Sequence, residues 1–114
     1  MSDTNLSQME CEACRADATP ATEAERKEYG SQIPEWEIVA VDGVDRLVRA
    51  YPFKDFAGAL AFTNRVGEIA EEAGHHPKIV TEYGRCEVSW WSHEMGGLHK
   101  NDFILAARTD ELPR

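Results

Sequence analysis

The sequence predicts an α+β fold, a four-stranded antiparallel sheet with three helices on one face, in the order α-β-β-α-β-β-α. Two pairs of short segments with alternating apolar and polar residues predict the sheet, because each pair is joined by a turn that contains Gly. The segments before, between and after these hairpins repeat apolar residues at helical spacing and predict the helices. Hairpins separated by helices in this way form an antiparallel sheet that the helices cover on one face.

The first helix has both a start signal and a stop signal. Thr22 is followed three residues later by Glu25, which is the pattern of a capping box. This pattern predicts a short helix over about residues 24–32. Pro34 ends the helix, because proline has no backbone N–H to donate.

The first hairpin follows this helix. Residues 36–41 predict one strand, and residues 46–53 predict the returning strand, with Pro52 near its end. The turn between them contains Asp42 and Gly43. This pair is typical of a tight primed turn, because Gly tolerates the positive φ that the turn requires.

The longest helix is expected over residues 55–73, with Gly74 as a left-handed cap at its end. Its apolar residues cover a wide arc made of two adjoining faces: Phe56, Ala59, Leu60 and Thr63 on one, and Phe62, Val66, Ile69, Ala70 and Ala73 on the other. Such an arc fits a deeply buried helix. It fits equally a helix that covers the sheet with one face and a second subunit with the other.

The second hairpin and the last helix complete the fold. Strands are expected over residues 79–82 and 86–91, joined by a Tyr-Gly turn, and a helix is expected over residues 99–112. Successive side chains of a strand point to opposite faces, so Trp90 and Trp91 should point apart. One of them then belongs to the core, and the other lines a site or an interface.

Composition and charge limit the class of protein. The chain has 114 residues, 42% of them apolar and 29% charged, which is typical of one globular domain. The formal net charge of −9 argues against nucleic acids and anionic membrane surfaces as partners, since both attract clustered Lys and Arg. No apolar stretch approaches the roughly 20 residues that span a bilayer, and no signal-peptide pattern is present, so we expect a cytoplasmic protein. We expect a flexible N-terminal tail over residues 1–21 and the folded domain over residues 22–114.

The cysteines carry a weak signal. The chain has three, Cys11, Cys14 and Cys86, and an odd number outside a secreted chain does not indicate a disulfide framework. Cys11 and Cys14 have the spacing of a metal or redox pair, but a structural zinc needs four ligands. We therefore expect a plain feature of the tail, with a metal or redox role as the alternative.

Three of the four histidines, His75, His76 and His93, cluster around the second hairpin. If the pairing of this hairpin is extended, His75 and His76 lie opposite residues 91–94, which brings His93 within a residue or two of them. Asp102 lies in the first turn of the last helix, where a carboxylate is stabilised and can turn back toward the histidines. Histidine exchanges protons near neutral pH, so a cluster without a Ser or Cys nucleophile indicates acid–base chemistry.

These residues also have structural interpretations. His76 could bond to the backbone where the helix passes into the strand, and Asp102 could serve only to start the last helix. His99 fits a surface or capping residue better than a catalytic one. A zinc site made of His75, His93 and Asp102 is a further alternative, although the spacing matches no common metal motif.

The sequence resembles the pterin-4a-carbinolamine dehydratase family. The family pattern combines a charged residue, two adjacent polar residues before a proline, an aromatic residue, a further histidine and an aspartate at set spacings. In this sequence the pattern reads Glu71, His75, His76, Pro77, Tyr83, His93 and Asp102. The resemblance extends from about Thr22 to Leu112, and the stretches 90–93 and 101–104 look most like bacterial members.

The resemblance implies a reaction and roles for these residues. Aromatic amino-acid hydroxylases leave their pterin as 4a-hydroxytetrahydrobiopterin, and the family removes water from it to give the quinonoid dihydropterin. The implied catalytic residues are His75 and His93, as proton donor and acceptor, and His76, which would hold the hydroxylated carbon. The implied substrate-binding residues are Pro77, Ser92, Glu94 and Asp102.

The resemblance also implies partners. It predicts a functional link to phenylalanine hydroxylase, and it requires no metal and no cofactor besides the pterin substrate. A homodimer or homotetramer would fit the wide apolar arc of residues 55–73. Two alternatives stay open: a role as an interaction or transcriptional cofactor, as in some animal members, and action on another pterin such as a molybdopterin intermediate.

Overall fold

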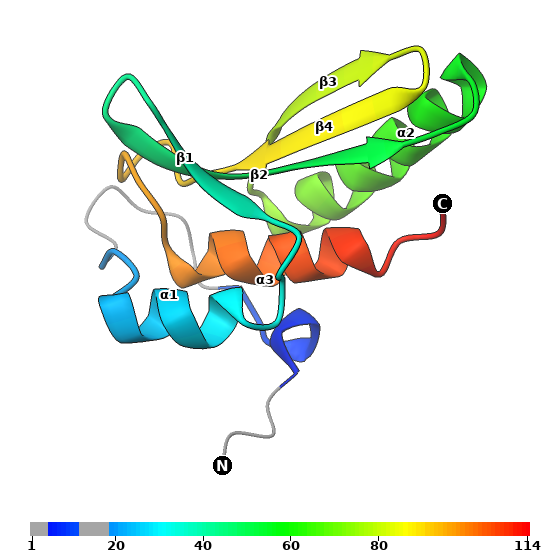
Figure 1. Cartoon of the computed structure of the whole chain (residues 1–114). Coiled ribbons are helices and arrows are strands. Elements are labelled where there is room, and N and C mark those ends of the chain that lie inside the picture. Colours follow the sequence, from blue (N-terminus) through cyan, green and yellow to red (C-terminus); the bar gives the residue numbers. More distant parts are fainter. Residues whose placement is uncertain (1–4, 12–18) are drawn as a thin grey trace.

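The computed structural model describes residues 5–11 and 19–114 and has one antiparallel sheet with the strand order β1-β2-β4-β3. All three α-helices lie on the same face of this sheet (Figure 1), so the predicted fold class is confirmed. The elements are the 3-10 helix η1 (Leu6–Gln8), α1 (Glu23–Gly30), β1 (Glu37–Val41), β2 (Val44–Pro52), α2 (Phe56–Ala73), β3 (Lys78–Glu82), β4 (Arg85–Trp90) and α3 (Lys100–Asp110).

The local signals in the sequence set the ends of these elements. Thr22 caps α1 and forms the expected capping box with Glu25. In the β1–β2 turn, Asp42 and Gly43 have φ angles of 52° and 79°, as a primed turn requires. Because such a short turn leaves little freedom in the pairing, the register of the hairpin follows from it.

The core lies between the sheet and the helices. From the sheet it receives the side chains that alternate toward the helices, and Tyr51, Val88 and Trp90 are fully buried there. Phe62 of α2 and Phe103 of α3 pack against them and are also fully buried. Burying an aromatic or branched side chain of this kind stabilises the fold by about 1.5–3 kcal/mol.

The two long helices are buried to different degrees. In α3 most side chains are buried, because the helix lies between η1, α1, α2 and the sheet (Figure 1). In α2 only Ala59, Phe62, Val66 and Ala70 are buried. Phe56 and Leu60 remain 45% and 43% exposed, so α2 is not the deeply buried helix that one interpretation of its apolar arc required.

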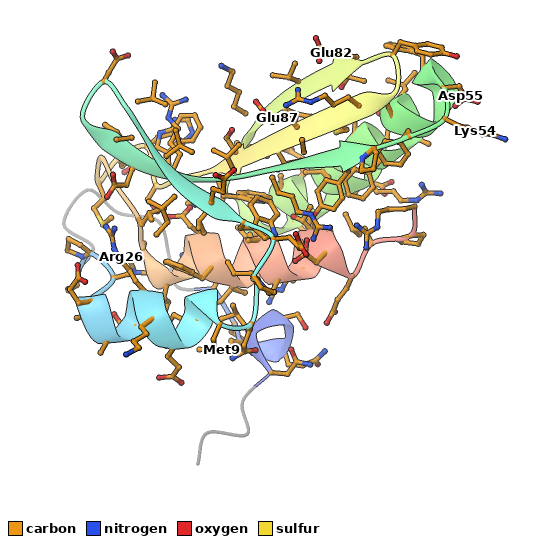
Figure 2. The ribbon with its side chains drawn as sticks, in the orientation of Figure 1. Met9, Arg26, Lys54, Asp55, Glu82 and Glu87 are labelled. Carbon is orange, nitrogen blue, oxygen red and sulfur yellow. The ribbon has the colours of Figure 1, made fainter. Side chains whose placement is uncertain are left out.

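Residues 5–11 differ from the expected tail, whose residues 1–4 and 12–18 lie outside the described residues. We predicted a flexible tail over residues 1–21, but residues 5–11 are packed against the domain. Leu6 is fully buried there, and η1 contacts α3. Arg108 of α3 donates to the backbone carbonyls of Ser7 and Met9, and Ser7 Oγ donates to Glu111 at 2.6 Å. Figure 2 shows Met9 beside this short helix. These contacts need α3 in place, so local sequence patterns could not reveal them.

Two further expectations concern the cysteines and the absence of a membrane-spanning segment. Cys14 of the predicted Cys11–Cys14 pair lies outside the described residues, whereas Cys86 is buried on the helix-facing side of β4. Burial raises the pKa of the Cys86 thiol, which accords with a cysteine of the core. Within the described ranges, no helix has the length and apolar character needed to cross a bilayer.

Candidate active site

The end of α2 fixes the position of the first histidine. Gly74 has a φ of 64° and ends the helix in the left-handed conformation. The Gly74 N–H donates to the carbonyl of Glu71 at 3.2 Å, and the His75 N–H donates to that of Ala70 at 3.1 Å. This pair of bonds is a Schellman motif, so the backbone of His75 is tied directly to the last turn of α2.

The side chain of His75 is buried beside a carboxylate. His75 is 4% exposed, and its Nε2 lies 2.7 Å from Oδ1 of Asp102, which has no exposed surface. The other oxygen of Asp102 accepts from Ser92 Oγ at 2.8 Å and from the His99 backbone N–H at 2.9 Å. A buried carboxylate is costly unless hydrogen bonds satisfy it, and these three donors do so.

Asp102 reaches this position because of where α3 begins. His99 is the N-cap of α3, its Nδ1 accepts from the Asn101 N–H at 3.0 Å, and Asp102 completes a capping box. The expected capping role of His99 is therefore confirmed, although its side chain is buried rather than at the surface. Asp102 does more than start the helix, because the same carboxylate that caps α3 also holds His75.

The side chains of the other two histidines lie at the surface. His76 is exposed, and its Nε2 contacts Oε2 of Glu71, one turn earlier in α2. His93 is also exposed and lies with its Nε2 at 3.0 Å from the backbone oxygen of His76. The hairpin register pairs Lys78 with Ser89, so the predicted approach of His93 to the His75–His76 pair is confirmed.

The hydrogen-bond partners select one ring tautomer for these histidines. A carbonyl or carboxylate oxygen can only accept, so the nitrogen that faces it must carry the proton. In His75, His76 and His93 that nitrogen is Nε2 in each case. In the neutral ring the lone pair then resides on Nδ1, which makes Nδ1 the proton-accepting atom of all three.

A closed turn carries the third histidine. The backbone of Ser92 pairs with Gly97, with Ser92 N–H donating to the Gly97 carbonyl at 2.8 Å and Gly96 N–H donating to the Ser92 carbonyl at 2.8 Å. Gly96 has a φ of 78°, which favours glycine at this position. His93 and Glu94 thus project from a turn whose base is fixed by backbone bonds.

The remaining predicted residues are placed differently from one another. Ser92 is buried and supports Asp102, so its role here is to satisfy the carboxylate. Pro77 is half-buried next to His76, and Glu94 is exposed. In the described part of the chain, no hydrogen bond or ion pair joins Glu94 to a histidine.

The geometry also bears on the metal alternative. Among residues 5–11 and 19–114, no group of three or more His, Cys, Asp or Glu side chains is arranged to hold a metal ion. His75, His93 and Asp102, which were considered as zinc ligands, do not form such a group.

One contact of the site was not anticipated from the sequence. The Arg46 guanidinium of β2 lies over the ring of Trp91, with 3.8 Å between its central carbon and the ring centroid. Trp91 in turn stacks on His93, with 4.2 Å between ring centroids and an angle of 30°. The alternation of side chains along the strand predicted that one of Trp90 and Trp91 lines a site or an interface. It could not predict the contact with Arg46, because no local pattern specifies that β2 pairs with β4.

Comparison with known proteins shows the family of the chain. Residues 19–112 match the family model described as pterin 4 alpha carbinolamine dehydratase. A protein of Nitrosococcus oceani named "Putative pterin-4-alpha-carbinolamine dehydratase" is 57% identical over 95% of this chain and 96% of its own length. A protein of the same name from Marinobacter nauticus is 54% identical over 95% of this chain and 97% of its own length.

A solved structure shares both sequence and fold with the chain. It is the crystal structure of a protein described as transcriptional coactivator/pterin dehydratase from Brucella melitensis, with 29% identity and a TM-score of 0.71. The match covers 81% of this chain and 96% of the other. The sequence matches and the fold thus define a pterin dehydratase-like protein. This chain belongs to the pterin-4a-carbinolamine dehydratase family.

Proposed function

We propose that this chain removes water from a 4a-hydroxytetrahydropterin, such as 4a-hydroxytetrahydrobiopterin, by histidine acid–base catalysis. The observation that carries the proposal is the arrangement of His75, held through Nε2 by the buried Asp102, directly before His76, whose carbonyl accepts from His93. Family membership and the names of the close relatives support it.

Proton transfers alone balance this reaction. The hydroxyl group leaves C4a with the electrons of the C–O bond and takes up one proton to become water. A ring nitrogen gives up one proton, and the C=N bond of the quinonoid product forms. An imidazolium and a neutral imidazole can perform both transfers near neutral pH, and such positioned catalysis typically contributes about 10²–10⁴-fold.

The histidines differ in how they could share this work. We propose His75 and His93 as the proton donor and acceptor, with His76 in contact with the pterin ring near the hydroxylated carbon. Asp102 would keep the His75 ring in one tautomer, in the way a buried carboxylate orients a catalytic imidazole. Pro77 and Glu94, which flank His76 and His93, remain proposed contacts of the substrate.

The test is stopped-flow dehydration of 4a-hydroxytetrahydropterin generated in place by a phenylalanine hydroxylase. We expect the wild-type chain to accelerate dehydration, and His93→Ala to lose about 10²-fold or more of that acceleration. His93 is exposed, so this variant should fold normally. Glu72→Gln, an exposed neighbour of the site on α2, should keep the wild-type rate. A folded wild-type chain that leaves the spontaneous rate unchanged would overturn the proposal.

The reaction would link this chain to phenylalanine hydroxylase, because the quinonoid product is the form that is reduced and used again. Reuse requires both enzymes to share a compartment, which we propose is the cytoplasm. The same assay with a molybdopterin-type substrate compares the alternative pterin directly. A faster rate on that pterin than on the hydroxylase product would move the assignment to it.

We also propose a homodimer or homotetramer that uses the exposed side of α2. Phe56 and Leu60 lie about one turn apart there, and an exposed apolar pair on a helix fits a second helix. Light scattering should give a dimer or tetramer for the wild-type chain, and Leu60→Asp should lower the mass. Ala24→Asp, the same change of charge on the exposed side of α1, should not. A monomeric wild-type chain would contradict this assembly.

A further inference from the structure

Three planar groups form a column on the sheet face that the helices leave open. Arg46 of β2 lies over Trp91 at 3.8 Å from the ring centroid, and Trp91 lies over His93 at 4.2 Å between centroids. Arg46 comes from a central strand, Trp91 is the residue directly after β4, and His93 belongs to the turn that follows. The column therefore connects the sheet to one histidine of the candidate site.

The register of the sheet produces this column. Leu47 pairs with Trp90, so the next residues along the two antiparallel strands, Arg46 and Trp91, stand opposite each other. Their side chains point away from the helices, because Leu47 and Trp90 point toward the core and side chains alternate along a strand. His93 follows Trp91 by two residues and therefore returns to the same side.

The column restrains a histidine that would otherwise be mobile. His93 is exposed, and an exposed ring held by a single hydrogen bond can still rotate about that bond. The Nε2–H bond to His76 fixes one edge of the ring, and the face of Trp91 fixes its plane. The two contacts together set the direction in which Nδ1 points, and such preorganisation lowers the entropic cost of reaching a reactive geometry.

Arg46 stands apart from the other arginines of the sheet and of α1. Arg26, Arg49 and Arg85 each pair with a carboxylate. Arg46 has no such partner among the described residues, and its buried Nε atom has no hydrogen-bond partner there. A guanidinium is weakly hydrated and stacks well on an indole, so its contact with Trp91 is the interaction that accounts for its position.

The two adjacent tryptophans serve different histidines. Trp90 is fully buried, donates from Nε1 to Thr109 at 3.1 Å, and stacks on His75 with 5.8 Å between centroids and an angle of 18°. Trp91 stacks on His93 from the other side of the strand. Each of the two histidines proposed for proton transfer thus has one indole against its ring.

We propose that Trp91, backed by Arg46, is a positioning residue that holds the His93 ring in the orientation needed for proton transfer. The inference rests on the proposed function of the site. It assigns to Trp91 no contact with the pterin and no proton to carry. The alternative is a purely structural stack that stabilises the end of β4 and leaves the chemistry unaffected.

The experiment compares Trp91→Leu, which removes the stack, with Trp91→Phe, which keeps an aromatic face. We expect Trp91→Leu to lower kcat by about 10–100-fold with KM changed by less than about twofold, since small misplacement of a reacting group costs rate rather than binding. Trp91→Phe should recover kcat to within about threefold. Arg46→Met should lower kcat by about two- to fivefold, the equivalent of one exposed cation–π contact.

A spectroscopic measurement separates positioning from stability. In Trp91→Leu the ring-proton NMR signals of His93 should lose the ring-current shift of the indole, whereas those of His75 should stay in place because Trp90 is intact. Val80→Ala, a change on the same open face of β3, should alter neither kcat nor the His93 signals. Thermal unfolding of each variant confirms that a folded protein is being assayed.

The outcomes distinguish the two proposals. An inactive wild-type chain would overturn the proposed function and with it the positioning role. An active wild-type chain whose Trp91→Leu variant keeps its kcat would overturn the positioning role alone. Failure of Trp91→Phe to recover kcat, or His93 signals that do not move in Trp91→Leu, would have the same effect.

Discussion

Replacing Asp102 by Asn removes the charge at the centre of the site while keeping the shape of the side chain. In the wild-type chain one oxygen accepts from His75 at 2.7 Å, and the other accepts from Ser92 at 2.8 Å and His99 N–H at 2.9 Å. The His99 backbone N–H can never reverse its role as a donor. The single amide oxygen of Asn should therefore turn to that side, which places the amide NH₂ group against His75.

This arrangement forces a change of tautomer in His75. Nε2 would have to accept from the amide, so the proton would move to Nδ1, and the ring would lose the accepting atom that Asp102 maintains. The chain would also exchange a charge-assisted hydrogen bond for a neutral one in a fully buried position. We expect a loss of about 1–3 kcal/mol in the free energy of unfolding and a loss of about 10²–10³-fold in kcat.

The assay combines three measurements on Asp102→Asn. Urea unfolding gives the stability, stopped-flow dehydration gives kcat, and ¹⁵N NMR of the imidazole gives the tautomer of His75. Asp55→Asn is the matched control, because Asn also caps helices well. Asp55 lies at the end of α2 opposite to His75 (Figure 2), and an 18-residue helix separates the two ends by roughly 27 Å. Wild-type kcat together with an unchanged His75 tautomer in Asp102→Asn would refute this reasoning.

Two further predictions concern stability. Gly74→Ala should lower the free energy of unfolding by about 1–2 kcal/mol, because the left-handed φ of 64° disfavours a side chain. Gly67→Ala, in the middle of the same helix, should raise that free energy by about 0.5–1 kcal/mol, and neither added Cβ meets another atom. Equal effects of the two variants in urea titrations would contradict the assignment to φ. Burial and the neighbouring Asp110 raise the pKa of Tyr51 above its ordinary value of 10.0. The contribution of Tyr51 to stability is therefore complete below pH 10. Above pH 10 only the unfolded chain ionises at this residue, so the contribution is lost at up to about 1.4 kcal/mol per pH unit. Tyr51→Phe should lose that part of the alkaline dependence, and an identical slope in both proteins between pH 9 and 11 would exclude it.

Most of the local architecture could be predicted because it depends on residues close together in the chain. The Thr22–Glu25 capping box and the primed turn at Asp42–Gly43 need no partner elsewhere in the molecule. The same holds for the approach of His93 to His76, because a tight hairpin turn fixes the register of its own two strands.

Other features depend on pairings between distant segments. Hydrogen bonds to Asp110 join the end of α3 to Trp36, Arg49 and Tyr51. No spacing in the sequence predicts these bonds. The position of α3 likewise explains why residues 5–11 are held against the domain. Each of these contacts forms only after elements far apart in the chain have packed together.

The sequence by itself determined the element order, the helix caps, the hairpin turns and the approach of His93 to His76. Only the tertiary structure decided that β2 lies beside β4, which sets Arg46 against Trp91, and that Phe56 and Leu60 of α2 remain exposed. The physical reason is how far apart in the chain the interacting residues lie. Caps and tight turns are determined by backbone geometry within a few residues, whereas strand order and the buried face of a helix follow from the apolar surface that the whole chain removes from water.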